Sequence, residues 1–342
     1  MTEELSYREK VILRCIIEEF IHTANPIGSR YISKSSEIKL SPATIRNVMS
    51  DLEELNYLTH THTSGGRVPT DKGYRYFVNE LMESEPLVQN EKDLLKAQIG
   101  EVEQGKDEIY KEVSKILGRL SKEISIVSQP YLSQGIFEKI ELVNLSSTKL
   151  LVVVSIQSGL VRTLLFDIES GISRDKIERI TGILNEKLSG LSLTEIRSTF
   201  LERIKDIQSD SQHIIKVFID SIDKIFQDEK EGMTLYFGGT TEILSQPEFG
   251  DTQNYRNIIE LTDEKNIVVH VLNNMPADEN GISISIGSES KDEKLKNYSI
   301  ISSEYNVGDV KGRIALIGPK RMNYSKMVSM LDFTSKIITE RT

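Results

Sequence analysis

The sequence predicts an α+β protein that begins with a winged helix-turn-helix unit. Residues 1–82 contain three helix-type segments followed by a short hairpin pattern. After residue 124, strand-type segments lie on both sides of a mostly helical block. A length of 342 residues is enough for two or three domains. We therefore expect a winged helix-turn-helix at 1–82, a linker with connecting helices at 83–123, an α/β domain in two segments at 124–172 and 277–342, and an inserted, mostly helical domain at 173–276.

Two helices are predicted at the start of the chain. Apolar residues recur at helical spacing from Tyr7 to His22, and residues 24–26, Ala-Asn-Pro, interrupt this pattern. A short second helix is expected at 29–35, with Arg30 on its polar side. Together with a third helix after residue 41, these segments match the arrangement of a helix-turn-helix.

The third predicted helix has a well-marked beginning and end. Ser41 is a good N-cap, and Pro42 takes the first helical position, where its missing N–H costs nothing. Asn56 can adopt the left-handed conformation that ends a helix. One face is apolar and comprises Ile45, Val48, Met49, Leu52 and Leu55. The opposite face of the first two turns comprises Ala43, Arg46, Asn47 and Ser50, with Thr44 at its border.

The polar face of this helix suits the major groove of DNA. Arginine pairs with guanine and asparagine with adenine in that groove, so Arg46 and Asn47 are candidates for reading bases. Recognition helices usually insert their N-terminal residues. The acidic residues at 51, 53 and 54 would be repelled by phosphate, so the second half of the helix should face away from DNA. The alternative is an ordinary amphipathic helix with a solvated polar face, and the hairpin that follows favours DNA binding.

A glycine-tipped hairpin is predicted directly after this helix. Residues 57–63 alternate and are rich in strand formers, Ser64-Gly65-Gly66 forms a turn, and residues 67–69 return. Arg67 is expected at the hairpin tip, within reach of a phosphate or the minor groove; the alternative for the glycines is a simple turn. The predicted DNA-binding residues are Ser29, Arg30, Ser41, Thr44, Arg46, Asn47, Ser50, Thr63, Ser64 and Arg67.

The sequence predicts no metal, no cofactor and no catalytic residues. His60 and His62 lie on the same side of one predicted strand, but the single cysteine, Cys15, lies on an apolar helix face, and no ligand spacing resembles a zinc site. We expect these histidines to be polar strand residues or phosphate contacts. Residues 238–241, Gly-Gly-Thr-Thr, lack the lysine of a phosphate loop and are interpreted as a turn.

The remaining three-quarters of the chain alternates between helical and strand patterns. An acidic linker at 83–90 precedes a helical stretch at 91–124. Strands are expected at 124–132 and within 139–168, helices within 174–228, and a strand at 233–237. From Asn266 the pattern is again that of strands, at 266–272, 282–287, 298–305 and 313–318, before a final helix at 323–339.

The net charge of −10 is carried mostly outside the predicted DNA-binding unit. Residues 1–80 hold ten basic and eleven acidic residues, net −1, so the remainder is net −9. Within residues 29–75, seven basic and five acidic residues give a net charge of +2. Non-specific DNA binding increases with the number of phosphates neutralised. We therefore expect modest binding by one protomer, which a homodimer would compensate.

The composition also predicts the cellular compartment in which the protein acts. A single cysteine excludes disulfides within the chain and fits a reducing compartment. The N-terminus lacks the pattern of a signal peptide, and the longest apolar run, at 150–154, is far too short to span a membrane. We expect a cytoplasmic protein without a membrane partner.

Seven sequence blocks together resemble the HrcA family of heat-inducible transcription repressors of bacteria. The most specific block runs from 40 to 58, LSPATIRNVMSDLEELNYL, and is followed by HTSGGRVPTDKGYR at 62–75. PIGSR at 26–30 fits the same pattern. Further matches are ILNEKLSGLSLTEIR at 183–197, GGTTEILSQPEF at 238–249, IGSES at 286–290 and GPKRMNY at 318–324. The departures are Asn56, Gly65, Ser290 and Lys320, where the family mostly has Gly, Ala, Asn and Thr; none lies in the predicted recognition helix.

The resemblance implies more than the residues alone do. It implies that the two-segment domain is GAF-like and that the inserted domain dimerises. It further implies that a homodimer binds a double-stranded inverted-repeat operator, the CIRCE element, ahead of class I heat-shock chaperone operons, and that the GroE chaperonin maintains the repressor's activity. The alternative is a small-molecule-responsive transcription regulator that uses the GAF-like domain as its ligand sensor.

Overall fold

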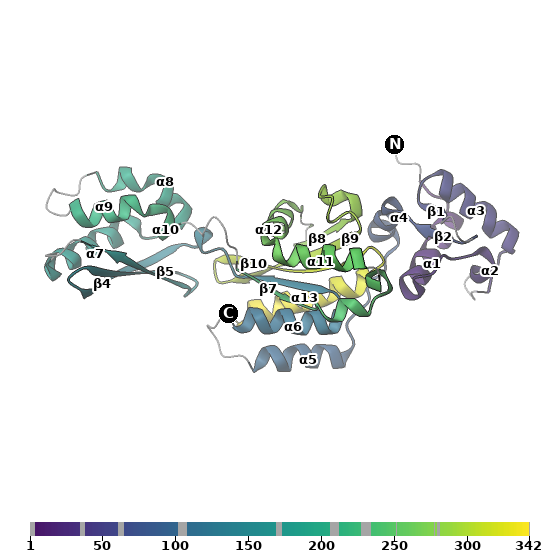
Figure 1. Cartoon of the computed structure of the whole chain (residues 1–342), viewed down its shortest axis with the longest axis horizontal. Coiled ribbons are helices and arrows are strands. Elements are labelled where there is room, and N and C mark those ends of the chain that lie inside the picture. The colour runs from purple at the N-terminus through teal and green to yellow at the C-terminus, as the bar shows by residue number, and fades with distance from the viewer. Residues whose placement is uncertain are drawn as a thin grey trace.

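Three parts follow one another along the long axis of the molecule: an N-terminal unit, a central domain and, at the far end, an inserted module (Figure 1). The computed structural model describes residues 4–341 apart from 35–37, 61–64, 102–107, 169–172, 206–211, 227–233, 251, 277 and 279–280. The predicted α+β class is confirmed. No helix within these residues combines the length and apolar character needed to cross a membrane.

The N-terminal unit has the predicted order of helices and hairpin. It comprises α1 (Tyr7–Thr23), α2 (Ser29–Ile32), α3 (Pro42–Glu54), strands β1 (Leu58–His60) and β2 (Arg67–Pro69), α4 (Asp71–Tyr76) and a π-helical turn η1 (Phe77–Leu81). Ser41 caps α3, and Asn56 has a φ of 61°, so both predicted ends of this helix are confirmed. Ile16 of α1 and Ile45 of α3 are fully buried, in a core that continues into the central domain.

The central domain is built on a five-stranded antiparallel sheet with helices on both faces. The strand order is β7 (Leu235–Gly238), β3 (Ile124–Ser128), β10 (Val310–Pro319), β9 (Tyr298–Val307) and β8 (Ile282–Ile286). Helices α6 (Glu108–Ser121) and α13 (Tyr324–Arg341) cover one face, with α5 (Gln89–Gly100) packed on their outer side, and α11 (Thr252–Asp263) and α12 (Lys265–Asn274) cover the other face (Figure 1). The helices that we predicted as connectors at 83–123 therefore belong to the central domain.

Alternation along β10 explains this three-layer arrangement. Ile314 and Leu316 belong to the core shared with α6 and α13, whereas Ala315 and Ile317 belong to the core shared with α11 and α12. Successive side chains of a strand point to opposite faces, so a strand buried on both faces is apolar throughout. Short 3₁₀ helices connect other elements, namely η2 (Leu132–Gln134), η4 (Glu242–Ser245), η5 (Pro247–Gly250) and η6 (Gly287–Ser290).

The inserted module has its own three-stranded sheet. Strands β4 (Phe137–Ser146), β5 (Lys149–Ile156) and β6 (Val161–Asp167) pair in the order β4-β5-β6. Helices α7 (Arg174–Leu188), α8 (Leu193–Arg203), α9 (Gln212–Asp220) and α10 (Ile222–Phe226) complete the module. Val152 and Val154 of β5 are buried in a core with Ile180 and Leu184 of α7, so one face of the sheet is covered by helices.

The sheet pairing corrects the predicted division of the chain after residue 124. We expected 124–172 to join 277–342 in one domain, but of that stretch only β3 pairs with the five-stranded sheet. β4, β5 and β6 pair only with one another, and they form one unit with the helices of 174–226. Because β3 pairs with β7, the insertion lies between these two strands, and the segment after 234 belongs to the central domain.

A second correction concerns residues 266–272, which we predicted as a strand. They form part of helix α12. Val268, Val271 and Leu272 lie three and four positions apart and are buried together against the sheet, which is the spacing of a helix face. A continuous apolar run does not distinguish a buried strand from a buried helix, and here the tertiary contacts decide.

Candidate nucleic-acid interface

Helix α3 exposes to solvent the two residues that we predicted to contact DNA bases. Ile45, Met49 and Leu52 are buried on one side, whereas Arg46 and Asn47 are exposed on the other. Within the described part of the chain, neither Arg46 nor Asn47 has a side-chain partner. Helices α2 and α3 lie at the end of the N-terminal unit remote from the central domain (Figure 1). An exposed arginine and asparagine near a helix N-terminus are available to base edges in the major groove.

The hydroxyl groups predicted at this surface are partly engaged in the helix itself. Ser41 Oγ accepts a hydrogen bond from Thr44 N at 3.1 Å and lies 2.9 Å from Thr44 Oγ1. Ser50 is half-buried, and its Oγ donates to Arg46 O at 3.2 Å. These residues therefore stabilise the start and the backbone of α3, and a contact with DNA from any of them stays a prediction.

Helix α2 contributes the remaining exposed cation that we predicted. Ser29 is its first residue and is half-buried, while Arg30 is exposed. Lys34 and Lys39 are also exposed, in the connection between α2 and α3. Both lysines were overlooked in the choice of DNA-binding residues. Their positions between the second and third predicted helices were the available signal, because cations beside a recognition helix can reach phosphate.

The predicted place of Arg67 at the hairpin tip is wrong. Arg67 lies in strand β2, opposite His60 of β1, and Thr63 and Ser64 lie outside the described residues. Arg67 Nε is 2.7 Å from Glu53 Oε2, and His60 Nδ1 contacts the other oxygen of the same carboxylate. Glu53 is thus half-buried at the foot of the hairpin. The hydrogen bond from His60 lowers the pKa of Glu53, and the charge of Arg67 acts in the same direction while burial opposes it.

The hairpin is also fixed to the turn between α1 and α2. Arg67 N donates to Ile27 O at 2.8 Å, and Ile27 N donates to Arg67 O at 2.9 Å. At Gly66, a Cβ atom would lie 2.6 Å from Pro26 O, so only glycine permits this approach. The backbone and the Glu53 carboxylate together hold the hairpin against the helices.

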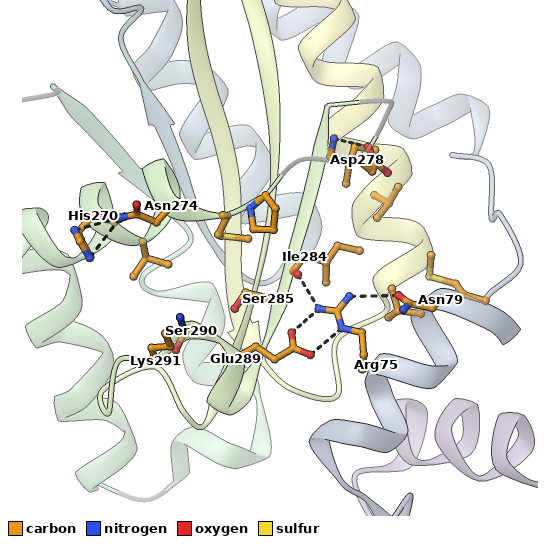
Figure 2. A pocket seen from close by; sticks show the side chains of 17 residues that line it. Arg75, Asn79, His270, Asn274, Asp278, Ile284, Ser285, Glu289, Ser290 and Lys291 are labelled. Carbon is orange, nitrogen blue, oxygen red and sulfur yellow. Dashed lines mark hydrogen bonds and ion pairs between the residues drawn. The ribbon is translucent and has the colours of Figure 1, made fainter. Parts of the chain in front are cut away.

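A cluster of polar residues, which we call the joint, connects the N-terminal unit to the central domain. Asp71 and Arg75 of α4 contribute one side, and Ser288, Glu289 and Lys320 contribute the other. Figure 2 shows the Arg75 guanidinium between the Glu289 carboxylate, the Ile284 carbonyl and Asn79. We assigned these residues no role from the sequence, although they belong to the blocks at 62–75, 286–290 and 318–324.

An open cavity of about 1030 Å³ adjoins the joint. Its wall includes Arg75 and Asn79 on one side and His270, Asn274 and Ser285 on the other (Figure 2). Two of the charged residues in its lining, Arg75 and Glu289, form an ion pair with each other, and Asp278 and Lys291 add one charge of each sign. The cavity therefore lends no support to a particular class of small-molecule ligand.

Comparisons with known proteins agree on one family. The model described as "Winged helix-turn-helix transcription repressor, HrcA DNA-binding" matches residues 4–83, and that described as "HrcA protein C terminal domain" matches residues 107–328. The heat-inducible transcription repressor HrcA of Chlorobium phaeobacteroides (strain BS1) is 37% identical over 342 residues, 97% of each chain. That of Chlorobium chlorochromatii (strain CaD3) is 36% identical, over 96% of this chain and 95% of its own. A hypothetical protein with a crystal structure at 2.2 Å resolution has a similar fold, with a TM-score of 0.57 and 21% identity over 99% of this chain and 100% of its own.

Proposed function

The chain belongs to the HrcA family of heat-inducible transcription repressors, and we propose that it represses class I heat-shock chaperone operons by binding an inverted-repeat operator, the CIRCE element, as a homodimer. The observation that carries this proposal is the exposed first half of α3, where Arg46 and Asn47 have no partner among the described residues. Arg46 and Asn47 would read bases, and Arg30 would contact phosphate.

A homodimer fits the low charge of the DNA-binding unit. Residues 29–75 carry a net charge of only +2, so one protomer neutralises few phosphates. Two linked recognition helices on one duplex bind far more tightly than either helix alone, and a two-fold symmetric protein matches an inverted repeat.

We place the dimer contact on the uncovered face of the inserted module's sheet. Val143, Leu151 and Leu165 form one row across β4, β5 and β6. Val143 is 42% exposed and Leu165 is 55% exposed, and Leu145 and Val161 are also exposed apolar residues of this sheet. An exposed apolar patch of this kind indicates an interaction site, and in a symmetric dimer the same patch serves both subunits.

The same surface supports the proposed dependence on the GroE chaperonin. A chain that exposes apolar strand residues before it pairs is prone to aggregate, and its active fraction then depends on chaperones. Heating would divert the chaperonin to other unfolded proteins, and repression would be lost. We propose that the protein acts in the cytoplasm, where chromosomal DNA and the chaperonin meet.

Replacement of Arg46 tests the DNA-binding function directly. Arg46→Ala should weaken binding to the operator by about tenfold or more, because a bidentate base contact contributes about 1–3 kcal/mol. Binding to random DNA should change much less. Gel-shift titrations of both duplexes at one fixed salt concentration measure this difference.

Arg256→Ala, which removes an exposed arginine of α11 in the central domain, is the matched control and should leave both affinities unchanged. Equal losses on operator and random DNA for Arg46→Ala would make Arg46 a phosphate contact. Absence of specific binding by the wild-type protein would contradict the proposed function itself.

A further inference from the structure

Asp71 is held by two separate loops of the central domain. Its Oδ2 accepts hydrogen bonds from the backbone N and from Oγ of Ser288, both at 3.0 Å, and its Oδ1 lies 2.6 Å from Lys320 Nζ. Burial alone would raise the pKa of Asp71, but the bonds from Lys320 and Ser288 bring that pKa below its ordinary value. The carboxylate is therefore ionised and engaged at neutral pH.

Arg75, one turn later on α4, is likewise held by residues of the central domain. Its Nε donates to Glu289 Oε1 at 2.8 Å, and Nη2 donates to Ile284 O at 2.7 Å. Glu289 Oε2 also accepts from Ile286 N at 2.9 Å, so the carboxylate is itself fixed at the start of η6. Hydrogen bonding to Glu289 raises the pKa of Arg75. A planar guanidinium that binds both oxygens of a carboxylate fixes direction as well as distance.

The contact surfaces at the joint are too close to tolerate a shift. Gly287 has a φ of 54°, and a Cβ atom there would lie 2.3 Å from Asp71 Oδ2. A second attachment lies at the end of α1, where Arg321 Nη1 donates to Ile21 O at 3.1 Å while Nη2 donates to Glu248 Oε2 at 2.8 Å. Attachment through both α4 and α1 restricts rotation of the N-terminal unit.

These contacts are better suited to orientation than to folding. The stability of this region comes from buried apolar residues such as Ile16 and Ile45, whose core continues into the central domain through Tyr74 and Tyr324. The side chains of Asp71, Arg75, Glu289 and Lys320 are a quarter to a third exposed, and ion pairs of that kind add little net stability. Directional charged pairs instead select one relative geometry.

We propose that Asp71 and Arg75 are positioning residues that determine which spacing between operator half-sites the dimer accepts. This inference rests on the proposed function. The inserted module lies at the opposite end of the molecule from α3 (Figure 1), so the separation of the two recognition helices in a dimer depends on every connection between these ends. Half-site spacing mirrors the separation of recognition helices. A fixed joint gives one preferred spacing, whereas a loose joint accepts many.

The test uses the full-length dimer and a set of operator duplexes. The spacer between the half-sites is lengthened or shortened in single base-pair steps. A duplex with one half-site measures the affinity of a single DNA-binding unit, which does not depend on spacing. Fluorescence anisotropy gives the affinity for each duplex. The variants are Asp71→Asn with Arg75→Gln on one side of the joint and, separately, Glu289→Gln on the other. Asp332→Asn, which breaks an ion pair with Lys336 within α13, is the matched control.

The wild-type protein and Asp332→Asn should lose at least about tenfold in affinity when the spacer departs from its preferred length, since the two helices then cannot both reach their sites. The joint variants should vary at least about threefold less than the wild type across the same spacers, because only the attachment through α1 remains, and their affinity for the single half-site should be unchanged. A wild-type spacing profile in both joint variants would overturn the inference.

Failure of the proposed function gives a different result. In that case the wild-type protein shows no preference for the operator at any spacing. Circular dichroism verifies that each variant is folded, and Glu289→Gln carries the test alone if the double variant does not fold.

Discussion

Glu123 is a carboxylic acid enclosed in the central domain. Its side chain packs against Gly318, where a Cβ atom would lie 2.0 Å from Glu123 Oε2. Among the described residues, this oxygen has no hydrogen-bond partner. Burial raises the pKa of Glu123 to about 8, although Gln246 and Arg321 oppose this effect. The group is therefore mostly protonated at neutral pH, and a neutral amide is its closest substitute.

Glu123→Gln should remove a pH-dependent weakness of the fold. Because the folded state has the raised pKa, it holds a proton that the unfolded state has lost between about pH 4.5 and pH 8. The free energy of unfolding therefore falls as pH rises through this range. Relative to wild type, the variant should gain up to about 4 kcal/mol between pH 5 and pH 8, from about 1.4 kcal/mol per pH unit. Urea denaturation at several pH values measures the gain.

An exposed glutamate provides the control for this measurement. Glu138→Gln, in β4, should follow the wild-type pH profile because its side chain is solvated in both states. Parallel profiles for Glu123→Gln and wild type would show that Glu123 titrates alike in the folded and unfolded chains.

At the scale of elements, the recognition helix and the hairpin form one unit through Glu53. The carboxylate contacts one residue from each strand, His60 and Arg67, where these residues face each other. We had expected the acidic half of α3 only to face away from DNA. Glu53 instead pairs with both strands of the hairpin, and we expect it to hold the wing against the helix.

Glu53→Gln should therefore loosen the wing without unfolding the unit. We expect binding to operator and to random DNA to weaken together, by roughly threefold to tenfold, because we expect the wing to reach phosphate, which carries no sequence information. Loss of this partly exposed pair should lower the free energy of unfolding by no more than about 1 kcal/mol. Gel-shift titration and thermal denaturation provide the two measurements.

Glu54→Gln is the neighbouring control, since Glu54 is exposed. If both variants bind DNA equally well, the contacts of Glu53 with His60 and Arg67 do not contribute to DNA binding. A large loss of stability in Glu53→Gln alone would indicate that the pair supports folding rather than wing position.

The sequence correctly predicted those structural features that depend only on neighbouring residues. Ser41, Pro42 and Asn56 determine the ends of α3 through caps and backbone preferences. Local pattern was insufficient for Val268 and Leu272, whose apolar run suits either a strand or a helix. It also could not show that β3 pairs with β7 across the insertion, because sheet partners are chosen by tertiary packing.

The residues of the candidate site also fall into two groups, those that local sequence could predict and those that it could not. The exposed residues of α3 follow from helical periodicity, so Arg46 and Asn47 were predictable. The partners of Asp71 and Arg75 were not, because Ser288 lies 217 positions from Asp71 and Glu289 lies 214 positions from Arg75. The ion pair of Arg67 with Glu53 was missed for a related reason, namely that it depends on how the hairpin folds back onto α3.

At the scale of the whole molecule, the two candidate contact surfaces lie at opposite ends. Helix α3 is at one end and the inserted module at the other (Figure 1). The charge distribution agrees with this separation, because residues 1–80 carry a net charge of −1 and the remainder carries −9. Most of the negative charge is thus kept away from the surface proposed to bind DNA, and the cost of electrostatic repulsion is reduced.

The proposed dimer contact can be tested with two variants, each of which places one charge on a different side of the inserted module. Leu165 is 55% exposed on the uncovered sheet face, and Leu201 is 57% exposed on helix α8. Leu165→Asp should weaken self-association by at least about tenfold, since it buries a charge in an apolar interface. Leu201→Asp introduces the same charge at an equally exposed position on the helical side and should leave the dimer intact. Sedimentation equilibrium measures both. Operator binding by Leu165→Asp should fall to the level of a single half-site. Dissociation by Leu201→Asp instead would place the interface on the helices, and an intact dimer in both variants would remove the inserted module from the interface.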